Sequence, residues 1–160
     1  MTAPSAADRR AVVIGVGNEF RRDDGAGPQV VARLRGRAPE AADLLVSDGE
    51  PTRMIEAWEG AALVIVVDAV RAEPAVPGRL HRLLLDQAAA GPSGSVSSHG
   101  FGLGDTIGLA LALDRMPARL IVHAVEAGDL GQGTGLSPAV AAVIDTLAAA
   151  VLRDLASLSR

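Results

Sequence analysis

Short apolar runs alternate with longer segments of helical periodicity along most of the chain. Apolar, β-branched runs bounded by glycine, charge or turn residues predict buried strands, and apolar residues three or four positions apart predict amphipathic helices. We expect strands at Ala11–Val16, Asp43–Val46, Ala61–Val67, Arg79–Leu85 and Arg119–Val125. We expect helices at Gly27–Arg37, Thr52–Trp58, Asp105–Leu113 and from Ser137 to about Ser157.

The order of these elements predicts the fold class. Strands that alternate with helices form a mostly parallel sheet with helices on both faces, because each parallel connection crosses the sheet. We therefore expect a three-layer α/β/α sandwich with about five strands, in which Arg79–Leu85 lies near an edge. Thr52 and Ser137 are expected as N-cap residues. Residues 1–160 are expected to form one domain, with residues 1–9 as a disordered tail.

Acidic and imidazole side chains follow the predicted strands. Asp23 and Asp24 come after the first strand, Asp48 after the second and Asp68 directly after the third, and His99 lies in the loop after the fourth. Ligands of open α/β sheets bind at the carboxyl ends of the strands. The sequence therefore predicts that these side chains gather on one rim of the sheet.

Three of these residues are the expected site: Asp24, Asp68 and His99. Of the adjacent Asp23 and Asp24, one is expected to cap the following helix, which leaves the other for a metal or a catalytic role. A carboxylate at Asp68, beside an uncharged apolar run, is costly unless it is paired. Two carboxylates and an imidazole suit nickel, zinc, manganese or iron, and leave positions for water or substrate.

Other motifs give weaker predictions. The glycines at Gly15 and Gly17 suggest a dinucleotide loop, but Phe20 stands where the third glycine belongs. A serine hydrolase using Ser97 or Ser98 lacks the G-x-S-x-G turn. The two remaining histidines are expected in structural roles, His81 on a strand surface and His123 in or near the core.

Composition excludes several classes of chemistry. The 160 residues contain no cysteine and no lysine, so thiolate metal sites, disulfides and a catalytic lysine are excluded. The formal net charge of −4 does not favour nucleic acid as a partner. We see no signal peptide and no apolar run long enough to span a membrane, and we expect a cytoplasmic protein.

Four segments, taken together and in order, resemble the hydrogenase maturation endopeptidase family. The segments are Val13–Asn18 followed by Asp23–Gly27, Val66–Val70, Ser98-His99 with Gly102-Leu103 and Asp105, and Val125-Glu126 with Gly135–Pro138. The similarity covers roughly Arg10 to Val151. Asp48-Gly49 resembles a D-G-G-T turn of the family, but Glu50-Pro51 intervene before the threonine, so a role for Asp48 does not follow.

The resemblance implies a phosphorylase/hydrolase-like α/β fold and a metal-dependent endopeptidase. It implies removal of a C-terminal extension from the precursor of a nickel–iron hydrogenase large subunit after nickel insertion. Asp24, Asp68 and His99 then correspond to the residues that contact nickel. Because the substrate carries the nickel, the free protein is expected to be empty or to hold another divalent metal. A monomer is favoured. The alternatives are a nickel-binding chaperone of hydrogenase assembly and a hydrolase of the peptidyl-tRNA type.

Overall fold

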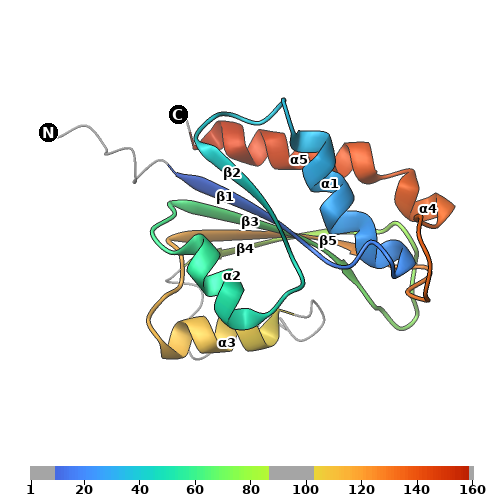
Figure 1. Ribbon diagram of the computed structural model, residues 1–160, viewed down its shortest axis with the longest axis horizontal. Helices are drawn as coiled ribbons and strands as arrows, with labels where there is room; N and C mark the ends of the chain where they lie inside the picture. The colour runs from blue at the N-terminus through green and yellow to red at the C-terminus, as the bar shows by residue number, and fades with distance from the viewer. Residues whose placement is uncertain (1–9, 87–102, 159–160) are drawn as a thin grey trace, which may run out of the picture.

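A five-stranded sheet runs through the middle of the molecule, with helices on both faces (Figure 1). The computed structural model describes residues 10–86 and 103–158. The strands are β1 (Ala11–Val16), β2 (Ala42–Ser47), β3 (Leu63–Val70), β4 (Leu80–Asp86) and β5 (Arg119–Glu126). Their order across the sheet is β2-β1-β3-β5-β4. The expected α/β/α sandwich with five strands is confirmed.

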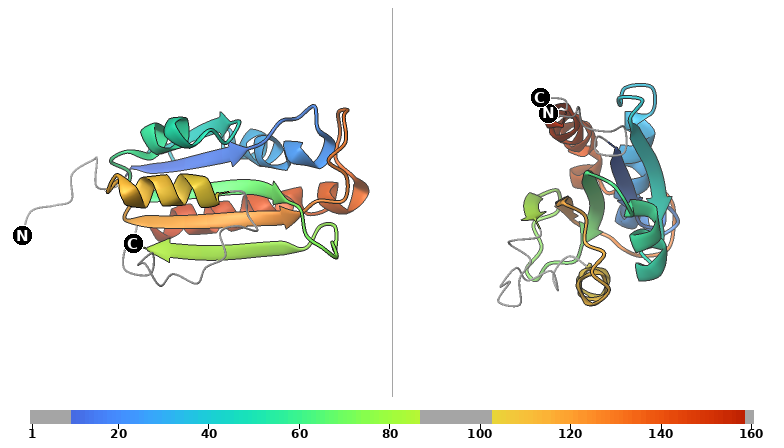
Figure 2. Two further views of the ribbon diagram at one scale, coloured as in Figure 1. Left: turned by 90° about the horizontal axis from the view of Figure 1, so that it is seen from below. Right: turned by 90° about the vertical axis from the view of Figure 1, so that its left-hand side faces the viewer.

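The direction of β4 differs from the other strands. The pairs β1–β2, β1–β3 and β3–β5 are parallel, whereas β4 runs antiparallel to β5 with Leu80 opposite Val125. In the left view of Figure 2, the β4 arrow points opposite to the arrows of β1, β3 and β5. The last residue of β4, Asp86, therefore lies opposite Arg119, where the parallel strand β5 begins. The two outermost strands of the sheet are β2 and β4.

Helices α1 and α5 cover one face and α2 and α3 cover the other (Figure 1). Their bounds, with the shorter helices, are η2 (Arg22–Gly25), α1 (Ala26–Leu34), α2 (Pro51–Trp58), α3 (Gly104–Ala112), α4 (Pro138–Ala141) and α5 (Ile144–Ser157). Among the described residues, no helix is long and apolar enough to cross a lipid bilayer.

Alternation along the central strands supplies a core on each face. In β3, Leu63, Ile65 and Val67 pack with α1 and α5, whereas Val64 and Val66 belong to the core that contains α2 residues. All five side chains have no exposed surface. A strand buried on both faces is apolar throughout, as expected for the centre of a parallel sheet. Its first polar residue is Asp68, which by the same alternation faces α2 and α3.

The expected N-cap of α2 and the expected continuity of the last helix are wrong, whereas the expected N-cap position of Ser137 is confirmed. Glu50, not Thr52, is the N-cap of α2, and its carboxylate accepts hydrogen bonds from the Thr52 and Arg53 amides. Pro51 is the first residue of that helix, where its missing N–H costs nothing. The long final helix is broken after Ala141 into α4 and α5. Ser137 is its N-cap by position, but its side chain caps no helical amide.

Candidate active site

Asp68 is a nearly buried carboxyl group near the carboxyl end of β3. The residue is 8% exposed. Burial is the main cause that raises the pKa of Asp68 to about 8, and the neighbouring charge of Asp24 raises it further against a hydrogen bond from the Ala69 amide. Two sequence-distant carboxyl groups therefore act on one another at this edge, as the strand-end rule predicted. Near neutral pH, Asp68 holds a proton.

Glycines allow the loop after β1 to place Asp24 there. Gly17 has a φ of 143°, and a Cβ at this residue would lie 1.8 Å from the Asp24 carbonyl oxygen. A Cβ on Gly27 would lie 2.6 Å from the carbonyl oxygens of Val16 and Val67, so α1 packs directly on the ends of β1 and β3. The backbone amide of Asn18 donates a 2.9 Å hydrogen bond to Asp24 Oδ2 and fixes the orientation of the Asp24 carboxylate.

Asp23 has a different role from its neighbour. It is fully buried and accepts four hydrogen bonds of 2.7–2.8 Å, from the amides of Gly128, Asp129 and Ser137 and from the Ser137 hydroxyl. Burial raises the pKa of Asp23, but these hydrogen bonds outweigh it and hold the pKa below its usual value. Asp23 thus ties the loop after β5 to the loop after β1.

The expected helix-capping role of this acid pair is wrong. Helix α1 begins after Gly25, and no side chain caps it. Nothing in the local pattern identifies the role of Asp23, because its partners are 105 to 114 residues away along the chain. The acid that remains beside Asp68 is Asp24, as expected.

His99 lies outside the described residues. The expectation that it reaches the rim because it follows the fourth strand is wrong in its reasoning, since β4 is antiparallel and ends at the opposite edge. Among residues 10–86 and 103–158, no group of three or more His, Asp or Glu side chains is placed to hold a metal ion. The described part of the site is therefore the pair Asp24 and Asp68.

Asp48 follows β2 at the same edge but has local partners. Its carboxylate accepts a hydrogen bond from the Glu50 amide at 3.1 Å and one from Arg53 Nη1 at 3.3 Å. The side chain is 61% exposed. These contacts stabilise the turn into α2, so the structure gives Asp48 a structural role.

The two described histidines pair with carboxylates other than Asp24 and Asp68. His123 is buried, and its Nε2 lies 2.6 Å from Asp154 Oδ2, while Arg82 Nη2 lies 2.8 Å from Asp154 Oδ1. Burial lowers the pKa of His123 more than Asp154 raises it. His81 is partly exposed and pairs with the buried Glu126 at 2.8 Å. His123 is thus a core histidine with a partner, as expected.

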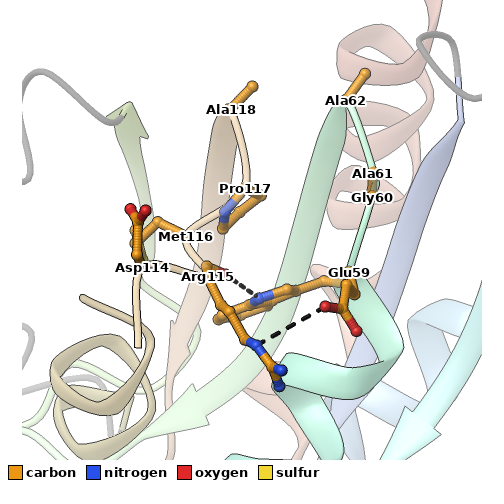
Figure 3. A pocket seen from close by; sticks show the side chains of 10 residues that line it. Glu59, Gly60, Ala61, Ala62, Asp114, Arg115, Met116, Pro117 and Ala118 are labelled. Carbon is orange, nitrogen blue, oxygen red and sulfur yellow. Dashed lines mark hydrogen bonds and ion pairs between the residues drawn. The ribbon is translucent and has the colours of Figure 1, made fainter. Parts of the chain in front are cut away.

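A cavity of about 470 Å³ lies at the other edge of the sheet, where β3 and β5 begin (Figure 3). Trp58 lines the cavity, and its indole N–H donates a hydrogen bond to the Arg115 carbonyl oxygen at 3.0 Å. Arg115 Nε lies 3.8 Å from Glu59 Oε1. Neither Asp24 nor Asp68 lines this cavity, which is formed by the turns that precede β3 and β5. Because ligands of such sheets bind at the carboxyl ends of the strands, we do not assign the chemistry to this cavity.

The acid pair supplies two kinds of chemistry. A protonated carboxyl group beside a second carboxyl can pass a proton to or from a reacting group near neutral pH. When a cation approaches, the repulsion between the carboxylates becomes attraction to the metal, and Asp68 loses its proton. The pair is therefore suited to sense a divalent cation and to couple its arrival to proton transfer.

Comparison with known proteins gives concordant matches. A family model described as hydrogenase maturation protease matches residues 28–154. The hydrogenase 2 maturation protease of Escherichia coli (strain K12) is 26% identical over 91% of this chain and 90% of its own length. Hydrogenase expression/formation protein HupD of Rhodobacter capsulatus is 30% identical over 95% of this chain and 74% of its own length. The solved structure of the hydrogenase maturating endopeptidase HybD from E. coli superposes with a TM-score of 0.75 at 24% identity, covering 92% of this chain and 93% of that one.

Proposed function

Since the chain belongs to the hydrogenase maturation protease family and is thus a peptide-bond hydrolase, we propose that it removes a C-terminal extension from a nickel–iron hydrogenase large subunit after nickel insertion. In this proposal the nickel belongs to the substrate and is recognised through Asp24, Asp68 and His99. The observation that carries it is the acid pair at the carboxyl edge, where Asp68 is nearly buried with its pKa raised to about 8.

Electrostatics supports recognition of a cation by this pair. A buried carboxyl next to a second carboxyl is costly in its charged form, and a divalent ion offsets that cost by pairing with both. A mixed set of carboxylate oxygens and an imidazole nitrogen suits Ni²⁺, because imidazole is a good ligand for this ion. With a precursor that lacks nickel, Asp68 keeps its proton and the pair gains no attraction to a cation, so the pair discriminates between loaded and empty substrate.

The length of the chain allows His99 to join the acid pair. Asp68 faces α2 and α3, and Leu103, at the start of α3, is buried in the core on that face. His99 precedes Leu103 by four Cα-to-Cα steps. At roughly 3.5 Å per residue they span up to about 14 Å. The proposal therefore assigns the third nickel ligand to His99.

Hydrolysis of the tail requires two proton transfers. A base removes a proton from the attacking water, and an acid gives a proton to the leaving amine of the extension. Because Asp68 releases its own proton when the cation binds, the proposed proton carrier is Asp24 or His99, which takes the proton from the water and then gives it to the leaving amine. The nickel of the substrate holds the scissile bond against these groups and polarises its carbonyl or the water.

We further propose that the protein acts as a cytoplasmic monomer. A chain without cysteine has no need of an oxidising compartment for its stability. The partner in this proposal is the large-subunit precursor.

The test is trimming of nickel-loaded precursor, followed by intact-mass spectrometry. Asp24→Ala, Asp68→Ala and His99→Ala are each expected to slow trimming by roughly a hundredfold or more. Asp145→Ala is the control, because this carboxylate is 82% exposed on α5. Wild-type rates in all three site variants would refute the assignment. Tight nickel binding by the isolated protein with no trimming of any precursor would instead indicate a nickel chaperone.

A further inference from the structure

The outer edge of β2 presents unpaired backbone groups beside the candidate site. The Gly17 amide donates to the Ser47 carbonyl oxygen at 2.9 Å and the Ala11 amide donates to that of Ala41 at 3.2 Å. Peptide groups alternate in direction along a strand, so those of Leu44 and Val46 point away from β1. Within the described residues β2 pairs with β1 alone. These groups are a template for an added strand.

An apolar groove runs beside this edge. A cavity of about 300 Å³ lies between β2 and α2. Its lining is mostly apolar, with Ile14, Leu45, Val46, Met54 and Ala57, and becomes polar at Ser47, Asp48 and Arg53. Leu45 is 36% exposed and Val46 is 52% exposed, although both belong to a strand. Free backbone groups with adjacent apolar side chains are what an extended peptide needs, because the backbone supplies affinity and the pockets select side chains.

We infer that this edge of β2 binds the C-terminal extension of the precursor as an added β-strand, with apolar side chains of the extension in the groove. The inference rests on the proposed function. In that function nickel holds the retained part of the substrate in its folded subunit, so the extension is the segment free to become extended. The groove adjoins the Asp24 loop, because Ser47, which lines the groove, accepts a hydrogen bond from the Gly17 amide and Gly17 lies against the Asp24 backbone.

Sheet geometry fixes which part of the extension docks. β1 lies between β2 and β3, and the added strand lies beyond β2, which places it three strand spacings from Asp68. At about 4.8 Å per spacing this is roughly 14 Å, or about four extended residues. The docked residues are therefore those beginning about four positions beyond the scissile bond.

The test compares two nickel-loaded precursors, one with its full extension and one with the extension shortened to three residues. Val46→Pro removes an outward N–H at an edge position, where proline is tolerated, and Val46→Thr keeps it. For the full extension, Val46→Pro is expected to raise KM roughly three- to tenfold with kcat unchanged, as for one lost hydrogen bond. Val46→Thr should match wild type, and the shortened precursor should be insensitive to both substitutions.

A second pair of variants tests the groove. Leu45→Glu is expected to raise KM for the full extension at least as much as Val46→Pro does, whereas Leu113→Glu, at an exposed leucine after α3, should not. Unchanged KM in Val46→Pro and Leu45→Glu, with native melting curves, would overturn the inference. So would equal effects on both precursors. If wild type trims neither precursor, the proposed function itself has failed.

A cross-linking experiment covers the case in which these variants do not fold. A photoreactive phenylalanine analogue at position 45 is expected to cross-link to the extension, and the same analogue at position 113 is not. Cross-linking from position 45 to a second copy of this chain alone would show that the edge pairs copies, and would overturn the inference.

Discussion

Replacement of Asp68 by asparagine should stabilise the fold at neutral and alkaline pH while it removes activity. The folded-state pKa of Asp68, about 8, lies above its usual value of 3.8. Between these two values the folded protein holds a proton that the unfolded chain has released. The free energy of unfolding therefore falls as pH rises from the usual pKa to the folded-state pKa. The stability that protonated Asp68 contributes is fully present only below the usual pKa of 3.8.

The magnitude follows from the same pKa values. Each pH unit inside the window costs about 1.4 kcal/mol, so between pH 5 and pH 8 wild type loses roughly 4 kcal/mol that the uncharged Asp68→Asn variant keeps. Titrating groups that do not interact with Asp68 are present in both proteins and cancel in the difference. The substituted amide keeps the shape of the carboxyl group and an oxygen that can accept from the Ala69 amide.

Urea unfolding at a series of pH values measures this difference. Trp58 is the only tryptophan and is buried, so its fluorescence reports unfolding. Asp145→Asn is the control, because its side chain is 82% exposed. The two stability curves should separate as pH rises for Asp68→Asn and stay parallel for Asp145→Asn. Parallel curves for Asp68→Asn would refute the claim that this carboxyl is buried against a second charge.

Three substitutions test the frame of the site. Gly27→Ala should lower the free energy of urea unfolding by roughly 1–3 kcal/mol or more, because its Cβ meets two backbone carbonyl oxygens at 2.6 Å; wild-type stability would contradict that packing. Asp23→Asn should cost roughly 1–3 kcal/mol for each donor left unpaired and should increase amide exchange in residues 128–137, whereas unchanged protection there would refute the tie. Trp58→Phe should cost about 1–3 kcal/mol in thermal unfolding through its lost bond to Arg115, and an equal melting temperature would count against that bond.

The sequence correctly predicts the positions of those site residues that lie at the carboxyl ends of parallel strands. Asp24 follows β1, and Asp68 lies near the carboxyl end of β3. β1 and β3 are parallel neighbours, so the strand-end rule places both acids at one edge. The same rule does not apply to the loop after β4, because the apolar pattern of Leu80–Asp86 does not show that this strand is reversed. Strand direction depends on how the following chain returns, and periodicity carries no information about it.

Long-range polar contacts are the other feature that the sequence does not show. Asp23 and Asp24 are equivalent in a local pattern, yet one accepts four hydrogen bonds from the loop after β5 and the other lies beside Asp68. The predicted N-cap of α2 lies two residues from its true position. Glu50 and Thr52 both have suitable side chains, and the longer carboxylate reaches both amides at the helix start.

Dependence of trimming on nickel tests the central claim most directly. Wild-type protein is incubated with matched nickel-loaded and nickel-free precursors, and the released extension is followed by intact mass. If the two aspartates recognise the nickel ion in the substrate, the nickel-loaded precursor is trimmed and the nickel-free precursor is not. Equal trimming of both precursors would contradict the account.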